Sequence, residues 1–322
     1  MENSLNRWTR QSLLDFLGEN GFIVIFVLWC VYLSLATDAF LTERNLFIVL
    51  RQASIVSLVA IGEMLVMLLG AMDISLAAIL GFTGVVTAGL MTAGQWAPLA
   101  AVVAGIAVGG LVGLINGLVI TKIKINSIIA TLGMLSILNG LAFLYTQGQT
   151  VYGAALDSIA FLARGYLDQL PVPVLVLFVF YAVFYFILSR TLWGARLYAV
   201  GSHEQAAWLS GLRVDRIKIT AFVVAGLLAG FGGVMQISRQ GSATAGMGDE
   251  FLFPILTAVV LAGVSLRGGK GRLLNVLLAS IFLVTITNGL VLLGTSIYLQ
   301  RIVSGLILIG ALSLDQLRLR TP

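Results

Sequence analysis

The sequence predicts an all-α protein, a polytopic membrane helix bundle of about ten transmembrane helices. The 322 residues are 59% hydrophobic and only 10% charged, and a soluble domain cannot hide that much apolar surface. The apolar residues fall into runs close to the roughly 20 residues that a helix needs to cross the hydrocarbon layer. The polar breaks between these runs contain most of the basic residues. Together these observations indicate many crossings and few extramembrane residues.

The apolar runs define the predicted elements in chain order. They cover residues 21–37, 47–69, 75–92, 99–121, 126–146, 172–189, 218–239, 253–266, 273–293 and 298–315. The eighth run is short, and the second and third are separated only by GAMDIS, residues 70–75. Without that polar break, the second and third runs would form one stretch too long for a single crossing.

The basic residues predict the orientation, because lysine and arginine accumulate on the cytoplasmic side of a membrane protein. An N-terminus inside the cell places fourteen of the nineteen basic residues on that side: Arg7, Arg10, Lys122, Lys124, Arg190, Arg196, Arg213, Arg216, Lys218, Arg267, Lys270, Arg272, Arg318 and Arg320. We therefore expect both termini to be cytoplasmic. The expected organisation is a cytoplasmic segment 1–20, a transmembrane domain 21–317 and a cytoplasmic tail 318–322. Within the domain, loop 190–217 is cytoplasmic and loop 147–171 lies outside.

Small residues recur at four-residue spacing in two of the predicted spans. Gly105, Gly109, Gly113 and Gly117 line one face of the fourth span, and Gly226 and Gly230 do the same in the seventh. Such stripes let two helix backbones approach closely within a membrane. We expect them to serve packing.

The sequence lacks the motifs of an enzyme. GVSLRGGKGR, residues 263–272, resembles a phosphate-binding loop only weakly. After Gly263 and Gly268, Gly269 stands where the lysine belongs, and the lysine that is present, Lys270, is followed by Gly271 and not by a hydroxyl residue. One histidine (His203) and one cysteine (Cys30) cannot build a metal site. We therefore expect no nucleotide, metal or other cofactor to be bound by this chain, and the excess of basic residues fits the membrane rule better than nucleic-acid binding.

Polar residues inside the predicted spans are the candidates for a translocation pathway. Glu63 lies within the second span, where a bare charge is costly, so it contacts a solute or proton or else bonds to a neighbouring side chain. Asp73 and Ser75 interrupt the apolar run; either could cap the next helix, and a broken helix can also serve a transport cavity. Four amides complete the set: Asn116, Asn139, Gln236 and Asn288.

The longest polar stretch of the second half is AVGSHEQAAWLSGLRVDRIK, residues 199–218. Ser202 and Gln205 fit a capping box, and Gly211 is a natural helix terminator. These signals predict a helix of about two turns with a small apolar face. A helix that short needs something to pack on, either the membrane surface or a soluble partner.

Four segments resemble the ribose-type sugar permeases, the membrane subunits of bacterial ABC importers. They are AVGSHEQAAWLSGLRVDRIKI, LGAMDISLAAILGFTGVV, KINSIIATLGMLSILNGLAFLYT and LTAVVLAGVSLRGGKGRLLNVLL. They occur in the order and spacing of the family, and the resemblance extends from about residue 21 to 315.

The resemblance implies a permease subunit that forms the pathway for a monosaccharide, ribose or a related sugar, across the bacterial inner membrane. The first implied partner is a separate ATPase that uses ATP and Mg²⁺. The second is a periplasmic sugar-binding protein, which meets the outer face of this chain, where loop 147–171 lies. The third is a second permease subunit, identical or similar to this one. The implied coupling helix to the ATPase covers 201–211, with the contact residues Gly201, Ser202, His203, Glu204, Ala206, Ala207, Leu209, Ser210 and Gly211.

Several positions depart from the family pattern. Ser202-His203 replaces Gly-Asn, Ala71-Met72 replaces Gly-Ile before Asp73, and Glu63 replaces an apolar residue. Two alternatives therefore stay open. The same kind of importer could transport another small polar solute, such as a sugar-like signalling molecule, a polyol or a nucleoside. The chain could also be an ion-coupled secondary transporter with Glu63 or Asp73 as its proton site.

Overall fold

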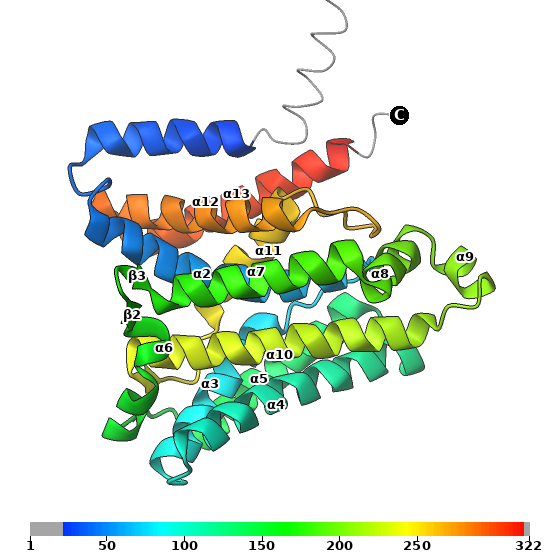
Figure 1. The fold of residues 1–322 in the computed structure, drawn as a ribbon, viewed down its shortest axis with the longest axis horizontal. Coiled ribbons are helices and arrows are strands. Elements are labelled where there is room, and N and C mark those ends of the chain that lie inside the picture. The colour runs from blue at the N-terminus through cyan, green and yellow to red at the C-terminus, as the bar shows by residue number, and fades with distance from the viewer. Residues whose placement is uncertain (1–21, 319–322) are drawn as a thin grey trace, which may run out of the picture.

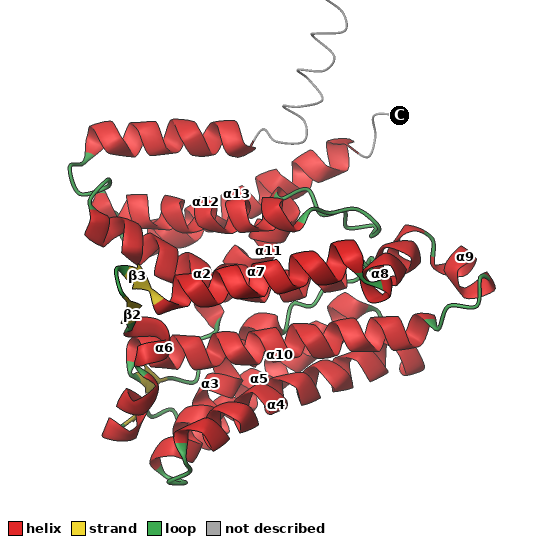
Figure 2. Cartoon of the chain, in the orientation of Figure 1, coloured by secondary structure: helices red, strands yellow, loops and turns green. Residues whose placement is uncertain are grey.

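The structure is a computed structural model that describes residues 22–318. Most of this range is helical (Figure 2), as the sequence predicts. The long helices lie side by side in one bundle, with most of their connections at its two ends (Figure 1). The predicted segment 1–20 and residues 319–322 of the predicted tail lie outside the described residues.

The helices follow one another with short connections. The first is the apolar helix Phe22–Ala36. The labelled helices are α2 (Glu43–Met67), α3 (Leu76–Thr92), α4 (Pro98–Leu118) with the π-helical turn η1 (Val119–Ile123), α5 (Ser127–Thr146), α7 (Val172–Arg190), α8 (Leu192–Ser202), α9 (Glu204–Leu209), α10 (Val214–Gln240), α11 (Leu252–Leu261), α12 (Leu273–Leu292) and α13 (Ile297–Arg318).

The predicted outer loop 147–171 contains small folded elements. They are β1 (Val151–Tyr152), the 3₁₀ turn η2 (Ala154–Ile159), α6 (Phe161–Arg164), β2 (Tyr166–Leu167) and β3 (Leu170–Pro171). β2 pairs with β3, and β1 pairs with β4 (Ser242–Ala243), both antiparallel. The second pairing fastens the loop to the segment after α10, at the end of the bundle opposite α9 (Figure 1).

The lengths of the helices refine the predicted spans. Among the described residues, six helices are long and apolar enough to cross a membrane, and Phe22–Ala36, Leu76–Thr92 and Ile297–Ser313 are apolar but shorter. The predicted break at 70–75 is confirmed, because α2 ends at Met67 and α3 begins at Leu76. α11 has only 10 residues, about 15 Å of helix, so this helix is shorter than the predicted eighth span and cannot cross the hydrocarbon layer alone.

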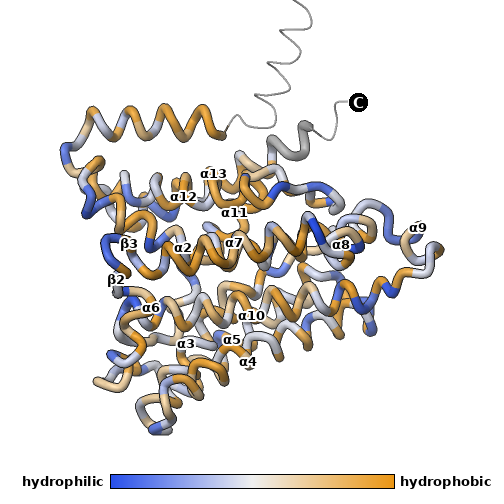
Figure 3. The backbone as a smooth tube through the Cα atoms, in the orientation of Figure 1, coloured by the Kyte–Doolittle hydropathy of each residue, from blue (hydrophilic) through white to orange (hydrophobic). Residues whose placement is uncertain are grey.

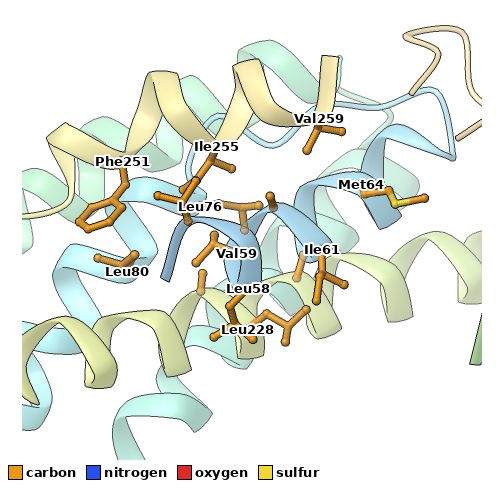
Figure 4. Close-up of a cluster of buried hydrophobic side chains, with 14 of the residues drawn as sticks. Leu58, Val59, Ile61, Met64, Leu76, Leu80, Leu228, Phe251, Ile255 and Val259 are labelled. Atoms are coloured by element: carbon orange, nitrogen blue, oxygen red, sulfur yellow. The ribbon is translucent and has the colours of Figure 1, made fainter. Parts of the chain in front are cut away.

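α2 is the centre of the packing. Figure 4 shows Leu58, Val59, Ile61 and Met64 of α2 between side chains of α3, α10 and α11. In the most apolar stretches of α2 and α10, 67% and 61% of the residues are buried, against 17% in α5. α2 and α10 therefore form the interior, and α5 presents most of its surface outward.

The glycine stripes pack α4 against α10, as predicted. A Cβ on Gly109 would overlap the carbonyl oxygen of Gly226, and a Cβ on Gly230 would lie 3.0 Å from the Cα of Ile106. The two backbones are thus in direct contact, which only small residues permit.

Hydropathy is distributed as expected for a membrane bundle. Figure 3 shows apolar residues along the middle of the helices and hydrophilic stretches mainly near the bundle ends. Large apolar side chains are exposed on the outer helices, such as Leu144 on α5 and Phe186 on α7. A soluble monomer rarely exposes apolar surface on this scale, so these faces fit contact with lipid.

Candidate functional site

Four of the predicted pathway residues meet at the break between α2 and α3. Glu63 comes from α2, Asp73 and Ser75 from the connection, and Asn116 from α4; none is more than 1% exposed. The Asn116 amide donates to the Asp73 carboxylate at 3.3 Å and to the Ser75 hydroxyl at 2.9 Å. The backbone N–H of Asp73 lies 3.3 Å from both carboxylate oxygens of Glu63. The break is therefore closed by a buried polar cluster.

Asp73 organises the turn into α3, but not by a helix-capping bond. Its Oδ1 accepts the backbone N–H of Ser75 at 2.9 Å and also the Ser75 hydroxyl. Ser75 is the N-cap residue of α3, yet its side chain makes no capping bond. The expectation that Asp73 or Ser75 accepts the free N–H groups of the helix is therefore wrong. Asp73 instead bonds to the backbone N–H of Ser75, the residue immediately before α3.

Two hydroxyls of α5 hold the other side of the connection, and the sequence reasoning missed both. Ser127 accepts the backbone N–H of Met72 at 3.2 Å, and Thr131 accepts that of Ile74 at 3.1 Å. Thr131 is fully buried. The connection 68–75 thus receives bonds from α2, α4 and α5, and each of its backbone N–H groups has a partner, as a non-helical break within a membrane bundle needs. Within residues 22–318, no group of three or more His, Cys, Asp or Glu residues could hold a metal ion.

The remaining pathway candidates lie elsewhere. Asn288 of α12 exchanges two amide hydrogen bonds with Asn45 of α2, at 2.8 and 3.1 Å, which joins two helices. Asn139 of α5 donates to Asp249 at 3.4 Å, and Gln236 of α10 donates to Glu250 at 3.0 Å.

Asp249 and Glu250 belong to the 3₁₀ turn η3 (Asp249–Phe251) between α10 and α11. The sequence reasoning passed over them, because acidic residues in a connection resemble an ordinary solvated turn. Burial raises the pKa of Glu250, while the positive charges of Arg239 and Arg301 act in the opposite direction. Two amides that looked scattered in the sequence therefore converge on one acidic turn.

The short cytoplasmic helix of the prediction is α9, which has 6 residues. Its N-cap is His203, whose Nδ1 accepts the backbone N–H of Ala206 at 3.1 Å. Ser202 is the last residue of α8 instead, so the predicted capping box of Ser202 and Gln205 is wrong. This contact gives His203 a local structural role at the start of α9.

The other end of α9 follows the prediction. Gly211 has φ +83°, and the N–H groups of Gly211 and Leu212 bond to the carbonyls of Trp208 and Ala207. This double closure is the Schellman motif, in which glycine takes the left-handed position without steric cost.

α9 is fixed on one side and free on the other. Glu204 bonds to Lys218 of α10 at 2.7 Å, and Ala207 is buried. Trp208 and Leu209 are 65% and 72% exposed. The predicted apolar face is therefore divided, because Ala207 packs inward while Leu209 points away. Trp208 was not among the predicted contact residues.

Three backbone segments touch where α8 ends, and we call them the glycine junction: 68–70, 201–202 and 268–269. The N–H of Gly269 donates to the Leu68 carbonyl at 2.8 Å. A Cβ on Gly201 would overlap that same carbonyl oxygen and lie 2.8 Å from the Gly269 nitrogen. Tyr198 of α8 adds a bond to the Gly271 carbonyl at 3.0 Å. The base of α9 thus contacts the segment that leads into the buried polar cluster.

Comparison with known proteins finds relatives over most of the chain. Residues 45–312 match the family described as branched-chain amino acid transport system / permease component. The ribose import permease of Bacillus subtilis is 36% identical over 89% of this chain and 90% of its own length. The L-arabinose ABC transporter permease of Azospirillum brasilense is 35% identical over 96% and 91%. The D-allose permease of Escherichia coli is 34% identical over 92% and 90%.

No solved structure shows a significant match to the chain. The resemblance to ribose-type permeases, read from four segments, is confirmed by relatives that span most of the protein. The family is one of multi-pass transport permeases rather than enzymes. The chain belongs to the branched-chain amino acid transport system / permease component family.

Proposed function

We propose that this chain is the membrane-spanning subunit of an ABC importer for a monosaccharide. Its relatives are named as permeases for ribose, arabinose, allose and fructose, and the matched region covers almost the whole bundle. The sugar crosses the bacterial inner membrane through a pathway formed with a second permease subunit, identical or similar.

The partners follow from the two ends of the bundle. The end with α9 is the cytoplasmic one, since it gathers basic residues of the loops 122–124, 190–218 and 267–272. A separate ATPase docks there and uses ATP and Mg²⁺. The opposite end, with the folded loop 147–171, receives the sugar from a periplasmic binding protein. On this orientation we propose that both termini are cytoplasmic. That requires ten crossings, one of them made by the short α11 together with the residues that flank it.

The observation that supports ATPase coupling most strongly is the shape of α9. It projects beyond the ends of the long helices (Figure 1), is capped at both ends, and exposes Trp208 and Leu209. Exposed tryptophan is a common anchor in protein interfaces. A helix so firmly built, and joined at its base to the glycine junction, suits the transfer of movement from a soluble partner.

Replacing the two exposed anchors tests the docking. We expect Trp208→Ala/Leu209→Ala to lower the affinity for the co-expressed ATPase by about tenfold or more, measured by co-purification and by sugar uptake into proteoliposomes. Both side chains are exposed, so the fold should persist. Trp96→Ala is the matched control, because Trp96 is 50% exposed but lies between α3 and α4 at the opposite end. An unchanged ATPase affinity would show that α9 is not the coupling helix.

Reconstitution separates the alternatives. Uptake driven by a pH gradient with this chain alone would favour an ion-coupled transporter. ATP-dependent uptake of a polyol, a nucleoside or a sugar-like signalling molecule, but of no sugar, would support an ABC importer whose transported solute is not a sugar.

A further inference from the structure

A cavity of about 420 Å³ lies between α8 and the start of α10, at the end of the bundle that is cytoplasmic in the proposed orientation. Sites for small polar ligands generally have volumes of about 300–1,000 Å³. Three of the residues that line this cavity are arginines, and none is acidic. We call it the arginine cavity, after Arg196 of α8 and Arg213 and Arg216 at the start of α10.

The three arginines have no counter-charge from the protein. Within residues 22–318, none of them forms an ion pair, and all three are exposed. The acidic residues close to them in sequence are already paired, Asp215 with Lys122 at 2.6 Å and Glu204 with Lys218 at 2.7 Å. The arginine cavity therefore keeps its positive charge and is open to a ligand.

The helical repeat places the charges of α10 on two faces. Arg213, Arg216 and Thr220 follow the spacing of one helix face and line the arginine cavity. Asp215 and Lys218 belong to the other face and line a separate cavity beside α9. The face of α10 that meets the arginine cavity thus carries only positive charge.

The same face becomes apolar toward the middle of the bundle. Val224 and Leu227 continue the spacing of Thr220, and Leu227 is 36% exposed. Figure 3 shows this order along α10, with a hydrophilic stretch at the end near α9 and apolar to neutral residues farther along. A basic site followed by exposed apolar side chains matches a phospholipid, in which a charged headgroup is followed by acyl chains.

α8 provides a second observation that favours a lipid. Trp193 lines the arginine cavity, and its indole N–H donates to the Thr220 hydroxyl at 3.1 Å, which joins α8 to α10. Its neighbour Leu192 is 73% exposed. Tryptophan is enriched where membrane meets water, and an exposed leucine beside it fits contact with acyl chains.

The charge of the arginine cavity indicates the class of lipid. Guanidinium groups bind phosphate oxygens through paired, parallel hydrogen bonds. A zwitterionic headgroup also carries an ammonium or choline group, which the three arginines repel. The headgroup of phosphatidylglycerol has one negative phosphodiester and two hydroxyls, and no positive charge. Basic pockets on the cytoplasmic side of membrane proteins are known to take such anionic headgroups.

We propose that the arginine cavity binds the phosphodiester headgroup of an anionic phospholipid from the cytoplasmic leaflet, such as phosphatidylglycerol. The bound lipid holds α8 and the start of α10 at the membrane surface, on the two sides of α9. The proposal goes beyond the importer function and does not depend on which solute is transported. An acidic surface of the ATPase has matching charge too, but exposed Leu192 and Leu227 beside the arginines favour lipid.

Lipid binding by the full-length protein tests the site. The purified protein is titrated in detergent with phosphatidylglycerol or with phosphatidylcholine, and native mass spectrometry measures the affinity of the first bound lipid. We expect phosphatidylglycerol to bind about tenfold more tightly than phosphatidylcholine. Arg213→Gln/Arg216→Gln should weaken phosphatidylglycerol binding by about 10- to 30-fold, since each arginine near an anionic lipid contributes about fivefold. Binding of phosphatidylcholine should not change.

Two further variants control for net charge and for folding. Arg267→Gln/Arg272→Gln removes the same charge from exposed arginines at the same end of the bundle, outside the arginine cavity, and should bind phosphatidylglycerol like the wild type. Arg213→Lys/Arg216→Lys keeps the charge but loses the paired donors. It should bind phosphatidylglycerol with an affinity between those of the wild type and the glutamine variant.

Several results would overturn the proposal. An equal loss of phosphatidylglycerol binding in both glutamine variants would show only general attraction to a basic surface. Displacement of the lipid by inorganic phosphate at equal concentration would identify a site for soluble phosphate instead. Unchanged lipid binding by Arg213→Gln/Arg216→Gln would refute the site, and weaker co-purification of the ATPase with that variant would assign the arginines to ATPase docking. The lipid assay uses neither sugar nor ATP, so its failure and the failure of the importer function are separate results.

Discussion

ATP-driven import by Gly201→Ala is expected to fall below about a tenth of the wild-type rate. The added methyl would overlap the Leu68 carbonyl oxygen and approach the Gly269 nitrogen, so α8 and the end of α2 must separate. Overpacking of this kind typically costs about 1–3 kcal/mol, and here the obstacle is backbone, which cannot move aside like a flexible side chain. The separation also breaks the contact between the base of α9 and the connection 68–75.

Uptake into proteoliposomes measures the loss of transport, and the melting temperature of the purified complex measures the loss of stability. Gly133→Ala is the control, because nothing lies within 4 Å of a Cβ at Gly133 on α5. A Gly201→Ala complex that transports and melts like the wild type would show that transport does not need the close backbone contact of Gly201 with Leu68 and Gly269.

Asp73→Ala is expected to cause the second large loss. The side chain accepts from the Ser75 N–H, the Ser75 hydroxyl and the Asn116 amide. Each buried donor left without a partner costs about 1–3 kcal/mol. We therefore expect the free energy of unfolding of the variant to fall by more than about 3 kcal/mol. We expect little monodisperse protein after detergent extraction and a lower melting temperature in what remains.

An exchange of two side chains distinguishes lost hydrogen bonds from lost charge. Asp73→Asn alone replaces one carboxylate oxygen with an NH₂ group, so that two amide donors can meet where Asn116 donates to Asp73. Asp73→Asn/Asn116→Asp restores one carboxylate and one amide in contact, with the Ser75 hydroxyl between them. Partial recovery of yield and stability in the double variant is the expected result. A double variant no better than Asp73→Asn would locate the requirement in the charge at position 73.

Features fixed by local chemistry could be predicted from the sequence. The break at 70–75 followed from run length, and Gly211 as terminator followed from its conformational freedom. The cap of α9 could not be predicted in the same way. Ser202 is the better N-cap by intrinsic preference, but α8 continues through it, so the first extended residue is His203 (φ −159°).

Features fixed by long-range packing were beyond the sequence. Asp73 and Glu63 stood out because charge is costly within a membrane, but their meeting with Asn116 depends on how α4 packs on the break. Thr131 resembled any hydroxyl in an apolar helix until α5 placed it against Ile74. Asp249 and Glu250 share a cavity wall with Gln300 and Arg301 of α13, a helix that begins 48 residues after Asp249.

The direct backbone contact of α4 with α10 also determines which parts of the protein can move. Interfaces built from interleaved side chains can adopt alternative rotamers, but contact between Gly109 and Gly226 leaves no such freedom. We therefore expect the two helices to form a rigid frame, around which the proposed importer alternates between outward and inward access. With one spin label on α4 and one on α10, we expect the distance between the labels to stay constant through the ATP cycle. That constant distance then serves as a reference for measuring the displacement of α9.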